Sequence, residues 1–487
     1  MTQASNKTRV ANGCLEEVAA ELAKVKNGEL ALKGLLENGP QKVFARNKNG
    51  KYLYVNENLA RDYKLPGAEI IAGIAVALTA FFASNVRADD SSEPAYSLHG
   101  FGTLGVTHSS EDKADYVGTF FQPNGAGHWR SWVASTDSKL GVQLDARFSD
   151  KLSGVIQVAS QYDWDSSYTP QIEWANLAYR VTPNFTLRAG RFVTSTFLTS
   201  ETRLVGYTYP WIRPPEEVYF TLPPTNKDGV DALYRFSAGN AVDTIQLSYG
   251  RANKKIPGNG EAVANHYLDV HNTWEHGATT VRLGYTSMDI DFHHPVLDGL
   301  FDGLVQFGNA VPGPAGQQAL ALGNGGRAVN APYSIVTIGM SHDPGDWLLM
   351  AEWARTRASA FVSNTTAWYI TGAYRIGKFT PYATVADSKP DKLPVPSIPT
   401  AGLPLPAAAA AAALNGGLAA TFNAFAFAQH SVSAGLRWDF HKDVDLKLQY
   451  QRLRTDPGSP GRLTNVQPGF QAGRAVNVFS LTVDFVF

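Results

Sequence analysis

Apolar and polar residues alternate along much of the chain, and the final segment shows this most clearly. Between Ala475 and Phe487 the odd positions are mostly apolar, whereas Ser480, Thr482 and Asp484 occupy even positions. A period of two residues is that of a β-strand with one apolar and one polar face. The same period recurs in other segments, at 140–148, 230–236, 432–440 and 446–451. The pattern predicts a chain built mainly of half-apolar strands.

Segments of this kind predict sixteen strands between residue 96 and the end of the chain. They span 96–108, 138–149, 152–163, 171–181, 184–192, 229–238, 242–251, 265–275, 278–289, 333–342, 346–357, 366–376, 378–388, 429–440, 443–454 and 474–487. A soluble sandwich would also show alternation, so alternation alone does not separate a soluble from a membrane-embedded sheet.

The connections between these strands separate the two possibilities. Tight connections fall at 149–151, 182–183, 239–241, 276–277, 343–345, 377 and 441–442. Long ones fall between them, at 109–137, 193–228, 290–332, 389–428 and 455–473. Short turns on one side and long loops on the other are typical of an outer-membrane barrel. The predicted fold class is therefore all-β, a transmembrane antiparallel β-barrel of about sixteen strands.

A barrel of this size has consequences for its interior and its ends. Closure is required because a bilayer core offers no partner for unpaired backbone groups. About sixteen strands make a barrel too wide for side chains to fill, so an aqueous channel is expected. An even number of strands puts both ends of the barrel on the same, periplasmic side.

An apolar run at 70–83 precedes the predicted barrel. It is shorter than the ~20 apolar residues that a spanning helix needs. Val86-Arg87-Ala88 follows it, before Asp89-Asp90, and small residues at these places are typical of a signal-peptidase site. We therefore predict a signal-peptide-like segment at 66–88 and a barrel domain at 89–487. A buried core helix is the alternative for the apolar run.

Residues 1–65 are predicted to form a small α/β extension. The segment 16–36 has a helical pattern, and the segment 42–58 contains two β-rich runs joined by Asn-Lys-Asn-Gly, which predicts a hairpin. Residues 38–71 resemble the opening of a PAS sensor domain, although the rest of such a domain is absent. A misassigned start or a gene fusion is one explanation, and a cytoplasmic sensor tethered to the barrel is the other.

Composition narrows the function further. The chain has 42 Lys and Arg against 43 Asp and Glu, so we expect no nucleic-acid partner. Its one cysteine, Cys14, precedes the barrel, which excludes disulfides and cysteine-based metal sites there. His293 and His294 lie near Asp289, but their spacing does not favour a metal site. We find no nucleophile elbow, phosphate-binding loop or zinc-protease motif, and predict no catalytic, cofactor-binding or metal-binding residue.

Three features give the chain a family resemblance. These are Phe487 at the end of an alternating strand, the Ala189-Gly190-Arg191-Phe192 segment that ends the fifth predicted strand, and the long segment 193–228 that follows. With them, residues 95–487 resemble the general porins of Gram-negative bacteria. The resemblance implies an outer-membrane homotrimer whose water-filled channel lets small hydrophilic solutes and ions diffuse. It also implies that Phe487 acts as a signal to the barrel-assembly machinery, and that outer-membrane lipid surrounds the barrel.

The resemblance also implies that segment 193–228 folds into the barrel as a constriction. The proline-rich stretch 210–217 departs from the short acidic loop common in the family. The candidate constriction residues are Arg188, Arg191, Glu201, Arg203, Arg213, Glu216 and Glu217. The alternative is that the charged residues of the loop lie at the mouth of the barrel, where water solvates them.

Inward positions on the predicted strands supply candidate residues along the channel wall. These lumen-lining candidates are Asp145, Arg147, Asp231, Arg235, Arg282, Arg437 and Lys447. Basic residues outnumber acidic ones at inward positions, which predicts a mild preference for anions. A substrate-specific channel and an outer-membrane barrel enzyme are the other function classes; the sequence favours a channel that is not an enzyme.

Overall fold

The computed structural model describes residues 44–46, 52–55, 95–391 and 394–487. The chain divides into two units, Met1–Val86 and Arg87–Phe487. In the first unit, β1 (Phe44–Arg46) and β2 (Tyr52–Val55) pair antiparallel, as the predicted hairpin requires. The predicted helix at 16–36, most of the PAS-like segment and the signal-peptide-like segment lie outside the described residues, and those assignments stay predictions.

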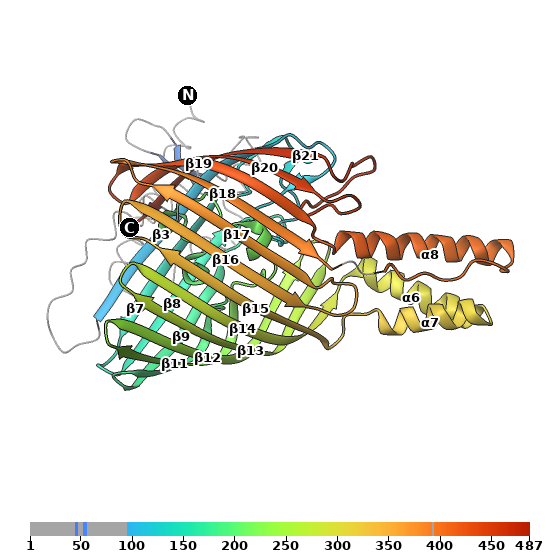
Figure 1. The fold of residues 1–487 in the computed structure, drawn as a ribbon, viewed down its shortest axis with the longest axis horizontal. Coiled ribbons are helices and arrows are strands. Elements are labelled where there is room, and N and C mark those ends of the chain that lie inside the picture. The colour runs from blue at the N-terminus through green and yellow to red at the C-terminus, as the bar shows by residue number, and fades with distance from the viewer. Residues whose placement is uncertain (1–43, 47–51, 56–94, 392–393) are drawn as a thin grey trace, which may run out of the picture. The chain divides into compact units, whose positions relative to one another are not determined.

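Sixteen long antiparallel strands close into a barrel in the second unit (Figure 1). They are β3 (Ala95–Ser109), β7 (Lys139–Arg147), β8 (Leu152–Gln161), β9 (Gln171–Thr182), β10 (Phe185–Val193), β11 (Asn226–Ala238), β12 (Ala241–Ile256), β13 (Gly260–His276), β14 (Thr279–His293), β15 (Ala331–His342), β16 (Trp347–Arg357), β17 (Thr365–Tyr374), β18 (Phe379–Pro390), β19 (Gln429–His441), β20 (Val444–Thr455) and β21 (Ala475–Val486). Each pairs with the next along the chain, and β21 pairs with β3 to close the barrel. The predicted fold class is confirmed.

The largest difference from the predicted strands is at β12 and β13. We expected strands at 242–251 and 265–275, but the hairpin continues past a register shift at Gly250/Ala252 to a turn between Ile256 and Gly260. Polar residues such as Asn253 and Lys255 lie in this extension, where they hide the alternation. The two strands are therefore long enough to extend beyond the apolar part of the barrel wall.

The outer face of the barrel is apolar and carries aromatic side chains towards both ends of its strands. Aliphatic residues such as Leu187, Leu247 and Ile338 are exposed in the middle of their strands. Exposed aromatic residues close to the short turns are Tyr234, Trp274, Trp347, Tyr374, Phe379 and Trp438. Exposed aromatic residues closer to the long loops are Tyr249, Tyr285, Trp353, Tyr450 and Phe479. An apolar band between two aromatic belts is what a transmembrane barrel presents to lipid.

The long loops carry the remaining elements. These are β4 (Asp115–Tyr116), β5 (Ala126–Gly127), β6 (Trp132–Val133), the 3₁₀ turns η1 (Ser200–Thr202) and η2 (Gly206–Thr208), and the helices α5 (Glu216–Tyr219), α6 (Pro295–Ala310), α7 (Pro314–Gly325) and α8 (Leu405–Ala424). Figure 1 shows α6, α7 and α8 standing together beyond the strand ends, on the side of the long loops. Helix α8 is long and apolar enough to cross a membrane by length and composition, but its buried residues pack in one cluster with those of α6 and α7.

The pairing of β21 with β3 depends on two glycines. Phe487 exchanges backbone hydrogen bonds of 2.8 and 3.0 Å with Gly100. A Cβ atom added to Gly100 would lie only 2.1 Å from Cζ of the Phe487 ring. Phe485 covers Gly102 in the same way. Each glycine therefore gives an aromatic ring of the last strand a place on the first strand.

We expect Gly100→Val to displace the Phe487 ring and weaken barrel closure, at a cost of about 1–3 kcal/mol. The measurement is the fraction of protein that migrates as the folded, heat-modifiable species on gels after refolding into lipid. Gly372→Val is the matched control, because nothing lies within 4 Å of a Cβ at that strand glycine. Equal folded fractions for the two variants would contradict the role given to the Gly100–Phe487 contact.

Candidate functional site: the loop inside the barrel

The loop between β10 and β11, residues 194–225, runs inside the barrel. We call it the inward loop. The Trp211 indole nitrogen donates hydrogen bonds to the hydroxyls of Thr371, at 2.9 Å, and Thr384, at 3.1 Å. Both threonines point inward. They lie on β17 and β18, which are across the barrel from β10 in the order of the strands. The loop therefore crosses the interior to the opposite wall, as the family resemblance implied for segment 193–228.

An apolar cluster holds the inward loop against that wall. Phe197, Trp211 and Tyr219 from the loop are at most 2% exposed and pack with Met350 and Tyr369 of β16 and β17. Rings and aliphatic chains of this size contribute most of the free energy of such contacts. This part of the barrel interior is thus filled by loop and wall side chains, which narrows the space left for water.

Glu352 of β16 fastens the same part of the loop by hydrogen bonds. Its carboxylate accepts from the Leu198 backbone N–H at 2.9 Å and from the hydroxyls of Tyr219 and Tyr369, each at 2.7 Å. The sequence places Glu352 at an inward position, but nothing in it indicates that the carboxylate binds a loop 154 residues away.

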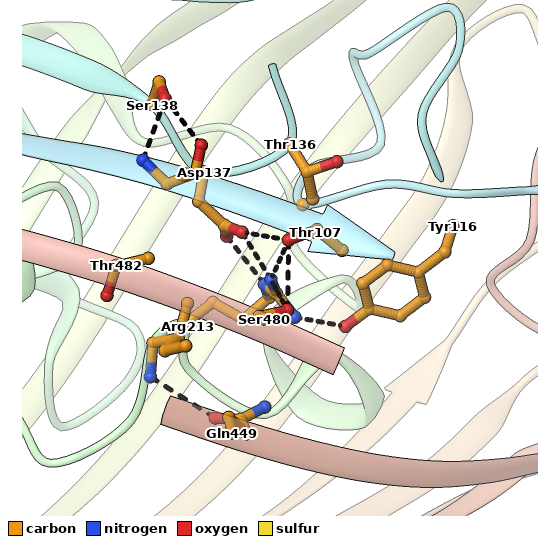
Figure 2. Close-up of polar contacts among 12 residues, drawn as sticks. Thr107, Tyr116, Thr136, Asp137, Ser138, Arg213, Gln449, Ser480 and Thr482 are labelled. Atoms are coloured by element: carbon orange, nitrogen blue, oxygen red, sulfur yellow. Dashed lines mark hydrogen bonds and ion pairs between the residues drawn. The ribbon is translucent and has the colours of Figure 1, made fainter. Parts of the chain in front are cut away.

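Arg213 anchors the middle of the loop to the wall at β3 and β21 (Figure 2). Its Nε donates to Asp137 Oδ1 at 2.8 Å and its Nη2 to Asp137 Oδ2 at 2.5 Å. Further donations reach the hydroxyls of Thr107, at 3.2 Å, Ser480, at 2.9 Å, and Tyr116, at 2.8 Å. Arg213 and Asp137 are each 7% exposed. The pair is therefore a buried, bidentate ion pair with its other donors satisfied.

Glu216 and Glu217 do not face open water either. The Tyr116 hydroxyl donates to Glu216, and Gln429 Nε2 donates to Glu217 at 2.8 Å. Glu216 is 2% exposed and Glu217 is 0% exposed. Together with Arg213 they were expected at the pore constriction; the structure instead buries all three between loop and wall. Each of the three has at least one hydrogen-bond partner in the surrounding protein.

Lys447, expected to line the lumen, is fully buried. Its Nζ donates to the Gly206 carbonyl of the inward loop at 2.6 Å and lies 3.0 Å from Asp484 and 3.9 Å from Asp445. Arg437 lies 3.2 Å from the same Asp445 and donates to the Tyr207 carbonyl at 2.5 Å. These wall charges bind the loop because its unpaired carbonyls face them.

Four of the predicted residues lie on the inner face of the barrel or on the inward loop. Arg188 pairs with the buried Asp231 at 2.5 Å, and Arg282 of β14 pairs with Glu201 of the loop at 3.1 Å. A small cavity of about 10 Å³ lies in this region, bordered by Glu201 and Arg203 of the loop. Its other wall includes Gln157, Glu173 and Trp174 of β8 and β9. The structure thus brings Arg188, Glu201, Arg203 and Arg282 to one side of the barrel interior.

Arg191, the remaining constriction candidate, lies on the outer face of the barrel. It pairs with Asp228 at 2.7 Å, and both occupy the register positions that share a face with the exposed Val230. Side chains alternate along a strand, so Arg188 and Arg191, three residues apart, must point to opposite faces. In the sequence, the apolar residues Leu187 and Ala189 at odd positions already indicate that Arg191, also at an odd position, faces outward.

The other lumen-lining candidates lie near the short turns. Asp145 and Arg147 end β7 on the inward side, and Arg235 of β11 pairs with Glu275 at 3.4 Å. The side chains of Arg235 and Glu275 are 64% and 46% exposed. These residues border the wider mouth of the interior rather than its narrow part.

No family model matches the chain, and no curated protein matches it. Solved barrel structures do match its fold. The anion-selective porin from Comamonas acidovorans is 10% identical with a TM-score of 0.47, over 81% of this chain and 100% of that one. The outer membrane channel DcaP of Acinetobacter baumannii is 12% identical with a TM-score of 0.47, over 82% and 99%. OmpF of Salmonella typhi, solved with daunomycin, is 12% identical with a TM-score of 0.46, over 80% and 97%.

The barrel itself identifies the cellular location. It is closed, so its strands leave no unpaired edge, and it carries an apolar band on the outside. Bacterial barrels with an even number of strands, short turns on one side and long loops on the other are proteins of the Gram-negative outer membrane. Helices α6, α7 and α8 accordingly belong to the extracellular side.

One of the two histidines singled out from the sequence, His294, has a structural role. The His294 side chain caps α6 by accepting a hydrogen bond from the Val296 backbone N–H at 3.3 Å. Within the described ranges, no group of three or more His, Cys, Asp or Glu residues could hold a metal ion.

Proposed function

We propose that the protein is a porin, an outer-membrane channel through which small hydrophilic solutes and ions diffuse passively. The observation that carries this proposal is the group of charged residues Arg188, Glu201 and Arg282 inside a closed barrel of sixteen strands, from which we infer a water-filled space between the inward loop and the wall. Charged side chains at a narrow level of a water-filled pore select solutes by charge and size. This space is the proposed constriction.

The resemblance to general porins supports three further parts of the proposal. The barrel would assemble as a homotrimer, contact outer-membrane lipid on its aromatic belts, and present Phe487 to the barrel-assembly machinery. Two alternatives remain as functions of the same barrel, a substrate-specific channel and an outer-membrane enzyme. The first has an observation in its favour, which is the aromatic cavity described in the next subsection.

Planar-bilayer recording tests the proposal directly. The full chain, purified in detergent and added to a bilayer, should give stepwise ohmic increases in current that scale with salt concentration. A conductance of zero from protein that is folded and heat-modifiable on gels would refute the diffusion channel.

Glu201→Gln is expected to shift the reversal potential towards anion selectivity. The Glu201 side chain is 37% exposed, and losing its charge leaves the Arg282 guanidinium without its carboxylate partner at the proposed constriction. The reversal potential is measured across a tenfold salt gradient. Asp228→Asn is the matched control, because it removes the same charge from the outer-face pair with Arg191. Equal shifts in the two variants would mean that Glu201 lies outside the ion path.

A further inference from the structure

A second and larger cavity lies at the extracellular end of the barrel. Its volume is about 160 Å³, and residues 220–224 of the inward loop form one side of it. The extracellular ends of β12 to β17 and the segments 358–363 and 425–427 form the others. None of the residues that border the proposed constriction lines this cavity.

The lining is dominated by phenylalanine. Six of the rings that line it come from the inward loop and four other segments: Phe120, Phe220, Phe292, Phe361, Phe425 and Phe427. Four of these pack edge to face, with centroid separations of 4.7 Å for Phe361–Phe425, 5.8 Å for Phe292–Phe425 and 5.7 Å for Phe425–Phe427. Edge-to-face packing is the arrangement that aromatic rings prefer, so a further aromatic ring is suited to join this cluster. A purely hydrophilic solute would gain nothing from this surface.

The two charged residues among the described lining residues, Lys254 and Arg462, are both basic. Arg462 is 6% exposed, and its guanidinium lies 4.8 Å from the Phe427 ring and 5.9 Å from the Phe220 ring. Its Nη2 donates to the Glu217 carbonyl and to the Ser388 hydroxyl, each at 3.1 Å.

The Nε of Arg462 is buried and has no hydrogen-bond partner in the described part of the chain. The acidic group that acts on it most strongly is Glu217. Glu217 Oε1 accepts a hydrogen bond from Gln429, and its Oε2 is buried without a hydrogen-bond partner among the described residues, so neither oxygen bonds to Arg462 Nε. Burial lowers the pKa of Arg462 to about 10, so the guanidinium is still positive at neutral pH. A buried cation with a free donor is costly unless an anion reaches it.

We propose that this cavity is a binding site for a small aromatic carboxylate. The ring would pack among the phenylalanines, and the carboxylate would accept a hydrogen bond from Arg462 Nε. Pockets that bind small molecules combine such an apolar lining with a few polar groups that fix the orientation. This inference rests on the proposed function in one respect. It names a class of solute that the proposed channel would bind at its extracellular mouth.

Binding is measured by titration calorimetry on the full chain in lipid nanodiscs, with empty nanodiscs as the blank for partitioning. The probes are 2-naphthoate, neutral 2-naphthalenemethanol and the non-aromatic cyclohexanecarboxylate. We expect saturable binding of 2-naphthoate. Each of the other two probes should bind at least roughly tenfold more weakly, because the alcohol lacks the carboxylate and cyclohexanecarboxylate lacks the aromatic ring. No saturable binding of 2-naphthoate, or equal affinity for all three probes, would overturn the proposal.

Three variants locate the site. Arg462→Met should abolish the preference for 2-naphthoate over its alcohol, and Phe361→Ala should weaken both aromatic probes while keeping that preference. Arg474→Met, an exposed arginine of the same loop, should change neither. Because Arg462 also holds the loop, only variants that stay heat-modifiable are compared, and Phe361→Ala tests the site independently. Unchanged binding in Phe361→Ala would overturn the assignment of this cavity.

The two proposals can fail separately. Binding without conductance would leave the aromatic site standing and refute the diffusion channel. Conductance without saturable binding would do the reverse.

Discussion

Replacing Arg213 with methionine is expected to lower the free energy of unfolding of the barrel by about 3–5 kcal/mol. The substitution leaves Asp137 buried and charged with no cation beside it, and it removes the donors that Thr107 and Ser480 accept from. Removing one partner of a buried pair costs more than the pair contributes, since the remaining charge stays desolvated. The loop should also move away from the wall, so the current of single channels should become larger and noisier.

The measurements are the midpoint of urea unfolding in lipid vesicles and single-channel recording. Arg235→Met is the matched control, because that arginine is 64% exposed and its loss should change stability by less than about 1 kcal/mol. The double variant Arg213→Met with Asp137→Leu should regain much of the lost stability, since both members of the buried pair are then removed together. A single variant as stable as the control would show that Arg213 does not anchor the loop.

Lys447→Met is expected to lower the free energy of unfolding by a similar amount, for a different reason. Lys447 is 0% exposed, and its ammonium group lies between the carboxylates of Asp445 and Asp484. Without it, two acidic groups face each other in the wall next to the closing pair β21–β3, where Thr103 also donates to Asp484. We expect a loss of about 3–5 kcal/mol and a lower folded fraction after refolding.

Lys442→Met tests whether this loss comes from burial rather than from charge alone. Lys442 lies five residues earlier in a short turn and is 88% exposed, so its replacement should leave the urea midpoint unchanged. Adding Asp484→Asn to Lys447→Met should restore part of the stability. If the double variant is weaker than Lys447→Met alone, the carboxylate pair is not the cause.

The strands could be predicted because each one repeats a two-residue pattern over most of its length. That pattern also separated inward from outward residues, and it placed Arg188 and Arg282 correctly on the inner face. The same rule would have moved Arg191 to the outer face. Arg191 was predicted at the constriction because it belongs to the Gly190-Arg191-Phe192 segment that carries the family resemblance, and its position in the alternating pattern was not applied.

The inward loop could not be predicted residue by residue. It has no period, so nothing in the order of its residues shows that Arg213 meets Asp137, 76 positions earlier, or that Trp211 meets Thr371. An inward position also does not decide whether a charge meets water. Lys447 and Arg235 both point inward, yet one is sealed under the loop and the other is open to solvent.

The contacts of the inward loop constrain the order in which the protein can assemble. Arg213 touches residues of β3 and β21, the first and last strands of the barrel, and Trp211 touches β17 and β18. Thr107 and Ser480 come together only when the sheet has closed, because β3 and β21 form the closing pair, whereas β17 and β18 are neighbours in the sheet. The Arg213 contacts are therefore expected to form after the Trp211 contacts can form, and a barrel halted one strand short would lack the full set of partners for Arg213.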